Sequence, residues 1–230
     1  MRLKVVSYNV HKAMGVDQRR RPDRILSVLN SIDADLALLQ EVDRRLGARP
    51  TALPRFLISQ ETDYRVVDVS GNDVSLGWHG NAILVRDGLT VATAGQLELP
   101  GLEPRGAVFA RIQGMTVVGT HLGLLRTWRL RQMHAIADEL EPELSRVIIG
   151  GDFNEWSPSG GFSPWSQKLK IIAPGRSFHA FRPIAPLDRF ALGSDLRLMD
   201  SGVVDRGEAR LASDHLPVWA DVEFNGSRRD

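Results

Sequence analysis

The sequence predicts an α/β fold in which two mixed β-sheets pack face to face and helices cover them. Three observations lead to this prediction. Short strand-like runs outnumber helical segments along the 230-residue chain. Some of these runs follow one another closely, as in hairpins, whereas others are separated by helical stretches, and that mixture favours mixed over purely parallel sheets. Several runs are apolar at every position, so both of their faces are expected to be covered.

Eight strands are expected from these runs. They lie at Leu3–Tyr8, Leu36–Leu39, Tyr64–Val69, Asn81–Val85, Ala107–Ile112, Thr116–Thr120, Val147–Ile149 and Val218–Phe224.

Three helices are expected between the strands. The segment "PDRILSVLNSI", residues 22–32, begins with a proline suited to a first helical turn and carries apolar residues at helical spacing. Residues 127–144 have an apolar stripe, with Thr127 as the expected cap. A third helix is expected over about residues 51–61, interrupted by Pro54. No repeat or linker divides the chain, so we expect one domain over residues 1–225 and a loose tail over 226–230.

The composition is that of an ordinary globular protein, with 43% hydrophobic and 25% charged residues. The formal net charge is +1, so bulk attraction to nucleic acid or to a membrane is not expected. The absence of cysteine excludes disulfides, thiolate metal sites and cysteine nucleophiles. The first residues alternate like a strand, and no apolar run approaches membrane-spanning length. We therefore expect a soluble, cytoplasmic protein without an integral membrane segment.

The stretch "GGDFNEW" follows directly on the apolar run Val147–Ile149. The two glycines, Gly150 and Gly151, are expected to let the backbone turn there. Asp152 and Asn154 would then emerge at the carboxyl end of a buried strand, where functional residues tend to lie. The alternative is a purely local Asx-type turn, in which these side chains bond to nearby backbone.

Five further segments supply polar side chains next to a strand. They are Asn9 and His11 in "YNVHK", Glu41 in "LLQEV", His121 in "THLG", Asp188 in "PLDRF", and Asp214 and His215 in "SDHLPV". Oxygen ligands such as those of Glu41, Asp214 and Asn9 suit Mg²⁺ or Mn²⁺ better than zinc. Magnesium also keeps several waters and needs few protein carboxylates.

The motifs "LLQEV", "GDFN" and "SDHLPV" resemble, in content and in order, those of the endonuclease/exonuclease/phosphatase superfamily. That group contains DNase I, AP endonucleases, neutral sphingomyelinases and inositol-phosphate 5-phosphatases. The matching residues span Asn9 to His215, nearly the whole chain. The resemblance implies a DNase I-like, four-layered α/β sandwich with the active site at one rim. It also implies metal-dependent hydrolysis of a phosphoester.

The resemblance implies a role for each of the three candidate metal ligands. Glu41 matches the central ligand of the metal, for which Mg²⁺ is expected and Mn²⁺ is possible. Asn9 and Asp214 match residues that help to hold or orient the metal and its water.

The resemblance also implies the catalytic residues. Asp152 matches the residue that orients or deprotonates the attacking water, and Asn154 matches the one that positions phosphate. His215 matches the active-site histidine, Asp188 the carboxylate paired with it, and His121 a second histidine that contacts phosphate.

Two positions depart from the nuclease pattern. AP endonucleases usually carry an aspartate at the place of His11, and "LDY" is commoner than the "LDR" that contains Arg189. Both departures put specificity for AP sites in doubt. The sequence looks more like a compact bacterial branch of the superfamily.

Weaker substrate-binding candidates are His11, His79, Asn81, Arg105 and Arg129. Each has an ordinary alternative. His79 could be a structural histidine, Arg105 could form a strand-end salt bridge, and Arg129 could lie with Gln132 on a solvated helix face. The basic run Arg19–Arg21 could grip a polyanion or mark a solvated loop.

The expected function is hydrolysis of a phosphodiester by metal-assisted attack of water. A compact or lipid-like substrate is favoured, because the charge is balanced and no Lys/Arg-rich segment with interleaved aromatics offers a surface for a nucleic-acid strand. A magnesium-dependent nuclease on DNA or RNA is the alternative. A catalytically inactive binding module is the second alternative, but the complete set of catalytic residues favours an enzyme. The phosphate ester is the expected partner, and no obligate protein partner is inferred.

Overall fold

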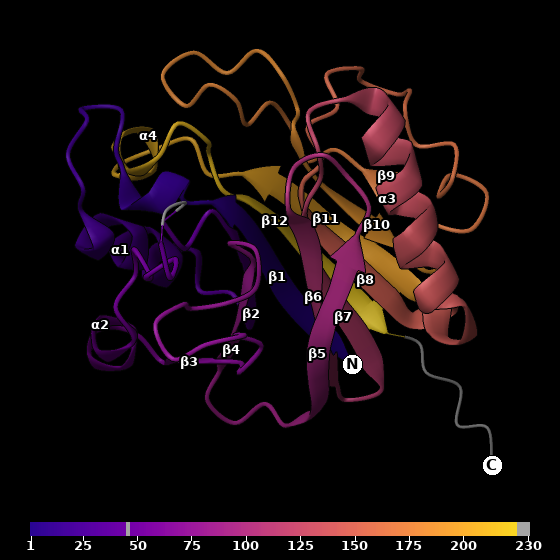
Figure 1. Cartoon of the computed structure of the whole chain (residues 1–230), viewed down its shortest axis with the longest axis horizontal. Helices are drawn as coiled ribbons and strands as arrows, with labels where there is room; N and C mark the ends of the chain where they lie inside the picture. The colour runs from indigo at the N-terminus through magenta and orange to yellow at the C-terminus, as the bar shows by residue number, and fades with distance from the viewer. Residues whose placement is uncertain (45–46, 225–230) are drawn as a thin grey trace.

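The protein is described by a computed structural model that covers residues 1–44 and 47–224 (Figure 1). Two six-stranded mixed sheets form its centre, with strand orders β11-β12-β1-β2-β4-β3 and β5-β6-β7-β8-β10-β9. The first sheet consists of β1 (Arg2–Asn9), β2 (Leu36–Gln40), β3 (Tyr64–Val66), β4 (Ala82–Arg86), β11 (Leu196–Val203) and β12 (Val218–Phe224). The second consists of β5 (Val91–Leu99), β6 (Arg105–Ile112), β7 (Met115–His121), β8 (Val147–Asp152), β9 (Lys170–Ile172) and β10 (Asp188–Leu192).

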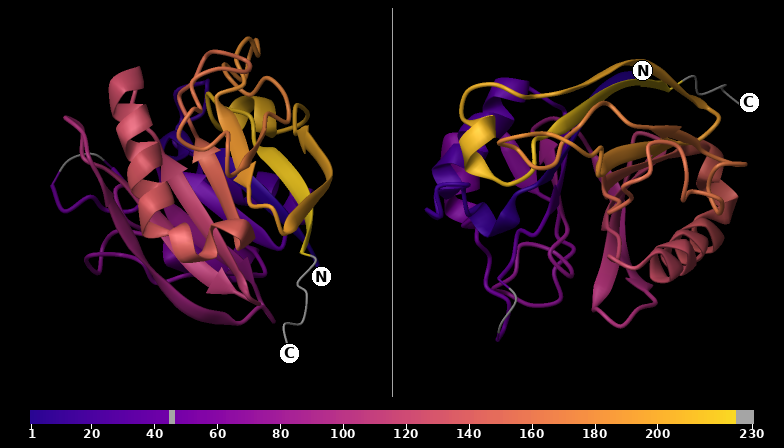
Figure 2. Two further views of the ribbon diagram at one scale, coloured as in Figure 1. Left: turned by 90° about the vertical axis from the view of Figure 1, so that its right-hand side faces the viewer. Right: turned by 90° about the horizontal axis from the view of Figure 1, so that it is seen from above.

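Helices lie outside both sheets, which gives the four layers that the family resemblance implied (Figure 2). The helices α1 (Pro22–Ile32) and α2 (Arg55–Glu61) cover the first sheet, and α3 (Arg126–Glu139) covers the second. Shorter helical turns are η1 (His11–Ala13), η2 (Glu141–Arg146) and α4 (Ala209–Ala212).

The alternation of side chains along each strand explains why the layers form. In β1, Val5 faces the second sheet and Val6 packs under α1, because successive side chains point to opposite faces. In β7, Val117 likewise enters the layer between the sheets, whereas Val118 packs against the residues of α3. The inner strands are therefore apolar at almost every position.

Two of the predicted helices begin elsewhere than expected. The helix predicted over residues 51–61 begins only at Arg55. Pro54 directly before it is extended, with ψ of 130°, and a proline disfavours the helical conformation in the residue that precedes it. Thr127 is not a cap, since α3 begins at Arg126 and follows Leu125, which makes no side-chain capping bond. The helix predicted over residues 22–32 is confirmed.

The strand predictions were incomplete. The strand expected at Tyr64–Val69 ends at Val66. Four strands were not expected at all: β5, β9, β10 and β11. Three of these lie at a sheet edge, where one side of the strand has no neighbour and the sequence need not be apolar.

The glycine pair in "GGDFN" does not form the turn that was expected. Both glycines lie inside β8, where they pair with β7. A Cβ atom on Gly151 would lie 1.8 Å from the carbonyl oxygen of Thr120, and one on Gly150 would lie 2.7 Å from a methyl carbon of Leu38. The glycines therefore permit close approach of the strands and of the two sheets.

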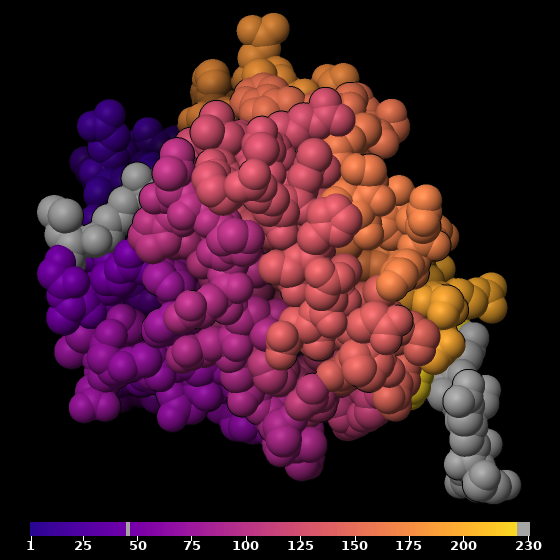
Figure 3. All heavy atoms as spheres, turned by 45° about the vertical axis from the view of Figure 1, so that its right-hand side comes forward, coloured from indigo at the N-terminus to yellow at the C-terminus, as the bar shows by residue number. Residues whose placement is uncertain are grey.

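One rim of the sandwich receives the carboxyl ends of β1, β2, β7 and β8 and the starts of β10 and β12. The segment between β8 and β10 rises at this rim in Figure 1 and protrudes from the surface in Figure 3, in orange. Among the residues described, no helix is long and apolar enough to cross a membrane. The single domain over residues 1–225 stays a prediction, and the predicted tail 226–230 lies outside the described residues.

Candidate active site

Asp152 lies at the centre of the polar cluster on the rim, as the last residue of β8 and only 2% exposed. Its Oδ1 accepts the backbone N–H of Asn154 at 3.0 Å, which is the Asx-type turn considered as an alternative. Its Oδ2 accepts a hydrogen bond from Nδ2 of Asn9 at 3.1 Å and faces two histidines. One carboxylate oxygen thus shapes the loop, and the other points into the cluster.

His215 and Asp188 form a buried pair beside Asp152. Nδ1 of His215 lies 2.7 Å from Oδ2 of Asp188, and its Nε2 lies 3.6 Å from Oδ2 of Asp152. Burial disfavours a charged imidazole here, but the carboxylates of Asp188 and Asp152 outweigh it and raise the pKa of His215 to about 10. At neutral pH His215 therefore carries a positive charge.

His121 approaches Asp152 from the neighbouring strand. It is the last residue of β7 and pairs in register with Asp152, and its Nε2 lies 3.4 Å from Oδ2 of that carboxylate. Burial lowers the pKa of His121 to about 4, although Asp152 acts in the opposite direction. The two histidines beside Asp152 thus have different charges at neutral pH, one positive and one neutral.

The "SDH" segment, residues 213–215, contacts Asn9 and His11 at the end of β1. Oδ1 of Asn9 accepts the backbone N–H of His11 at 3.1 Å, while the hydroxyl of Ser213 donates to the carbonyl of Asn9 at 2.7 Å. The ring Nδ1 of His11 lies 3.5 Å from Oδ1 of Asp214. Ser213 therefore ties the "SDH" segment to the first strand, and this contact gives the motif its place on the rim.

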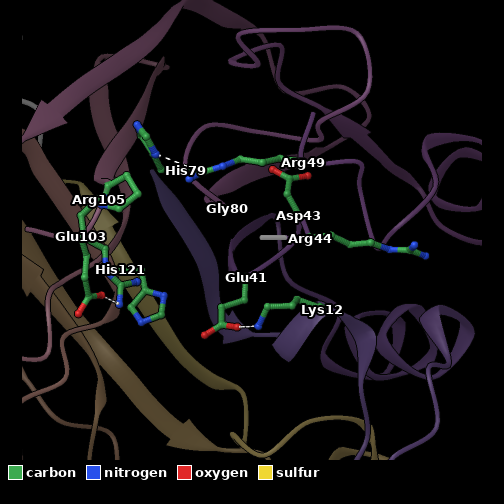
Figure 4. Close-up of a pocket in the computed structure, with 11 residues that line it drawn as sticks. Lys12, Glu41, Asp43, Arg44, Arg49, His79, Gly80, Glu103, Arg105 and His121 are labelled. Carbon is green, nitrogen blue, oxygen red and sulfur yellow. Dashed lines mark hydrogen bonds and ion pairs between the residues drawn. The ribbon is translucent and has the colours of Figure 1, made fainter. Parts of the chain in front are cut away.

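Glu41 follows β2 in a left-handed backbone conformation, with φ of 55°. The ammonium of Lys12 contacts its carboxylate, and the backbone N–H of Lys12 donates to its carbonyl at 2.9 Å. Lys12 itself has a φ of 57°. Lys12 follows β1 and Glu41 follows the adjacent strand β2, and both have a strained backbone. These two turns bring the ammonium of Lys12 to the carboxylate of Glu41 (Figure 4).

A pocket of about 340 Å³ opens beside Glu41 and His121 (Figure 4). Its walls carry charges of both signs. They are formed by Lys12, Glu41, Asp43, Arg44, Arg49, His79, Gly80, Glu103, Pro104, Arg105 and His121.

The donor set at the rim fits a hard divalent cation held by few protein ligands. No cluster of three or more His, Cys, Asp or Glu side chains forms a metal cage in the described part of the chain. Magnesium does not need one, because it keeps several waters and binds one or two carboxylates. The carboxylate of Glu41 already lies against a cation, the ammonium of Lys12. Glu41 would therefore hold the metal once the ammonium of Lys12 moves away from its carboxylate.

Of the weaker candidates, His79 and Arg105 line the pocket, whereas Asn81 is structural in its contacts. Nδ2 of the buried Asn81 donates to the carbonyl of Gly106 at 3.0 Å. Arg105 forms the salt bridge that was considered for it, with Glu103 at 2.8 Å.

Arg129 and Gln132 do not lie on a solvated helix face. Arg129 is 6% exposed and donates to Oε2 of Glu155 at 2.8 Å and to the carbonyl of Leu124 at 2.5 Å. Gln132 accepts the backbone N–H of Gly123 at 2.8 Å. Both side chains hold the segment after β7 in place, so the charge of Arg129 is already engaged by the protein.

The basic run near the first helix agrees with the interpretation as a solvated loop. Arg19–Arg21 are exposed, and Arg21 pairs with Asp23.

Arg189, the departure from "LDY", is buried. Its guanidinium donates to four carbonyl oxygens, those of Pro186, Glu155, Ser157 and Pro158, at 2.6–3.0 Å.

Sequence reasoning missed several residues of the site. Lys12 stands directly after His11 in "YNVHK", and that adjacency was the only available signal for it. Arg49 lies between predicted elements in a segment with no recognisable pattern. Ser213 was visible within "SDH", although its role as a tie to Asn9 depends on a contact 204 residues away along the chain.

The chain is similar to known proteins over nearly its full length. The uncharacterised protein YbhP of Escherichia coli strain K12 is 25% identical over 251 residues, and the similarity covers 96% of each chain. The mannosyl-6-phosphatase of Bacteroides thetaiotaomicron VPI-5482 has a TM-score of 0.76 at 19% identity, covering 96% of this chain and 100% of that one. TDP2 of D. rerio, complexed with a single strand DNA product, has a TM-score of 0.72 at 15% identity, covering 97% and 99%.

The likenesses to the two solved structures show a shared fold. A family assignment comes from the sequence, in which residues 6–215 match the Endonuclease/Exonuclease/phosphatase family. That match contains all eight of the residues predicted to form the catalytic and metal-binding set. The chain therefore belongs to the endonuclease/exonuclease/phosphatase family.

Proposed function

We propose that this protein is a metal-dependent phosphoesterase that hydrolyses a phosphodiester through attack of a water molecule. The observation that carries the proposal is the environment of Asp152. Its buried carboxylate lies between a charged imidazole and a neutral one, at 3.6 and 3.4 Å. A base with a charged donor beside it suits a reaction in which a proton leaves water while negative charge develops on phosphate oxygens.

In the proposed reaction, Asp152 orients the water and accepts its proton as the water oxygen bonds to phosphorus. The ester P–O bond breaks, and the proton finally goes to the departing alkoxide, which leaves as an alcohol beside a phosphomonoester. The imidazolium of His215 donates to a phosphate oxygen through Nε2, and Asp188 holds the ring by its Nδ1–H. Asn154 is fixed near the phosphate by its bond to the carbonyl of Leu122, at 2.8 Å.

The family is generally dependent on a divalent metal, and Mg²⁺ is the ion we propose. Bound at Glu41, it would polarise the phosphate oxygens and stabilise the charge that develops on them. Asn9 and Asp214 would orient the surrounding water through their oxygen atoms. Mn²⁺ has similar ligand preferences and would substitute for it.

We propose a compact or lipid-like diester as the substrate, with a nucleic acid as the second candidate. The net charge of +1 supports the first choice. The burial of Arg129 supports it as well, because only its exposed neighbours Arg126 and Arg131 are left for a basic patch on this helix. The likeness to TDP2, which was solved with a single strand DNA product, keeps a nuclease in consideration. A cytoplasmic location and action without a protein partner remain predictions from composition.

The test is hydrolysis of bis-p-nitrophenyl phosphate and p-nitrophenyl phosphate with Mg²⁺, with Mn²⁺ and with a chelator. We expect metal-dependent turnover of the diester that is lost in Asp152→Ala. Asp73→Ala removes an exposed aspartate in a loop and serves as the control. Absence of turnover of either ester with both metals would favour the inactive binding module and overturn the proposal.

A second experiment separates the substrate classes. Specific activity is measured on plasmid DNA, single-stranded RNA and phospholipid vesicles at equal enzyme and magnesium over rising salt. Turnover of vesicles is the expected result. Efficient cleavage of DNA that falls steeply with salt, disappears in Asp152→Ala and occurs without lipid turnover would establish the nuclease instead.

A further inference from the structure

The walls of the pocket beside Glu41 carry basic side chains together with the carboxylates of Glu41, Asp43 and Glu103. Four Lys or Arg side chains line it. Two of them face carboxylates, since Lys12 contacts Glu41 and Arg105 binds Glu103. Arg49 differs, because its guanidinium donates to a histidine ring, Nδ1 of His79 at 3.0 Å, and it forms no ion pair with any of the described carboxylates.

The contact between Arg49 and His79 sets the hydrogen-bonding state of the histidine. Arginine can only donate, so Nδ1 of His79 must accept, and the neutral ring then carries its proton on Nε2. Burial and the charge of Arg49 lower the pKa of His79, which keeps the ring neutral. The pair thus offers a permanent cation and a neutral N–H donor from the same wall of the pocket.

Arg105 lies on the opposite wall. Its outer nitrogen Nη2 donates to Glu103 at 2.8 Å, and its buried Nε has no hydrogen-bond partner among the described residues. Figure 4 shows Arg105 and Glu103 across the pocket from Arg49.

The pocket is continuous with the catalytic cluster. His121 lines the pocket and also lies 3.4 Å from Asp152. Gly80, beside His79, packs on Glu41: a Cβ at this glycine would lie 3.5 Å from the Glu41 Cα, and its carbonyl accepts the N–H of Val42 at 3.0 Å. One small ligand could therefore contact the catalytic residues and the pocket wall together.

We propose that this pocket binds a second phosphate group of the substrate, with Arg49, His79 and Arg105 as its donors. The inference rests on the proposed phosphodiesterase function and names the class of substrate, a diester that carries another phosphate next to the scissile one. A guanidinium with an adjacent N–H donor suits phosphate oxygens, which accept charge-assisted hydrogen bonds. The second phosphate is either a terminal monoester or the neighbouring phosphodiester of a chain.

The test uses three chromogenic esters that differ in one group. They are thymidine 5′-(4-nitrophenyl phosphate) with a 3′-hydroxyl, with a 3′-phosphate and with a 3′-methyl phosphate. We expect the 3′-phosphate to lower KM by about tenfold or more, which is the effect of one charge-assisted hydrogen bond. Arg49→Gln and Arg105→Gln should bring the ratio of the two KM values towards one. Arg197→Gln, in the exposed part of β11 at the opposite end of the sheet, should keep the ratio.

The 3′-methyl phosphate distinguishes a terminal phosphate monoester from the neighbouring phosphodiester of a chain. If it lowers KM as much as the 3′-phosphate does, the pocket accepts the phosphodiester of a chain, and if only the 3′-phosphate acts, the pocket takes a terminal monoester. Equal KM values for all three esters in the unmodified protein would overturn the proposed pocket function while leaving the hydrolase intact.

A binding measurement keeps the pocket testable without turnover. Calorimetry on the metal-free protein compares thymidine 3′,5′-bisphosphate with thymidine 5′-monophosphate. We expect the bisphosphate to bind about tenfold more tightly, and Arg49→Gln to remove the difference. Equal affinity for the two nucleotides would overturn the inference, whereas loss of hydrolysis with the difference in binding retained would overturn only the phosphodiesterase. The thermal midpoint of each variant shows that it is folded.

Discussion

Nδ1 of His215 lies 2.7 Å from Oδ2 of Asp188, and this contact is the shortest link between side chains of the candidate catalytic set. The other oxygen of the carboxylate, Oδ1, is buried and has no hydrogen-bond partner among the described residues. The side chain of Asp188 therefore acts on the site through His215. It orients the ring and favours its charged form, so an aspartate that is fully buried would affect the proposed reaction at the rim.

Replacement of Asp188 by asparagine should leave the fold intact and lower kcat by roughly 10²–10⁴-fold, the range for a general acid–base group. The neutral amide can no longer offset the burial of the imidazolium, so the pKa of His215 should fall as well. Both effects are measurable, by steady-state kinetics and by NMR titration of the ring. Turnover equal to that of the unmodified protein would show that the two residues do not act as a pair.

Glu41→Gln should weaken Mg²⁺ binding by about tenfold or more and remove most of the activity. The amide keeps the shape of the side chain but is a poorer ligand for a hard dication. Calorimetric titration with Mg²⁺ measures the affinity, and Glu139→Gln, an exposed position on α3, is the control. Unchanged affinity at the catalytic site would remove Glu41 from the ligand set.

Lys12→Met should have the opposite effect on the metal. The ammonium of Lys12 and the ion compete for the same carboxylate, so removal of the ammonium should raise the Mg²⁺ affinity by about tenfold. Methionine keeps a flexible, unbranched chain of similar length. Lys168→Met, at an exposed lysine that lies 3.8 Å from Glu141, controls for the lost charge. A weaker affinity in Lys12→Met would mean that the lysine supports the metal site.

Arg189→Lys should destabilise the protein by ~2 kcal/mol or more. The guanidinium binds four carbonyl oxygens in a fixed fork, and a single ammonium cannot reach them all, so buried acceptors would lose their partners. Urea denaturation measures the loss. A free energy of unfolding equal to that of the unmodified protein would show that water replaces the guanidinium.

The residues expected at strand ends were predictable because each of the signals is local. An apolar run followed at once by a polar residue, as at Asp152 or His121, shows both the strand and its end. Their convergence on one rim followed from the family resemblance. The fold was thus accessible from the sequence, and the roles of these residues stay predictions.

The rest of the site was not accessible, since it depends on contacts between distant segments. Arg49 belongs to no regular element, and its meeting with His79 is visible only after folding. The same holds for Arg189, whose partners lie in another loop about thirty residues away. Its departure from the familiar pattern pointed to specificity, whereas its contacts show a brace for the loop after Asp152. The edge strand β5 escaped notice because most of its side chains are exposed.

Three neighbouring strands carry His121, Asp152 and Asp188 on the same rung of their hydrogen-bond ladder. The sheet itself fixes how these residues face one another, and a slip of one residue would turn a side chain to the opposite face. Insertions and deletions within β7, β8 or β10 should therefore abolish activity. The segments between these strands are free of that constraint, so they can change in length and composition over evolution. Related proteins could in this way acquire new substrates while the hydrolytic machinery stays the same.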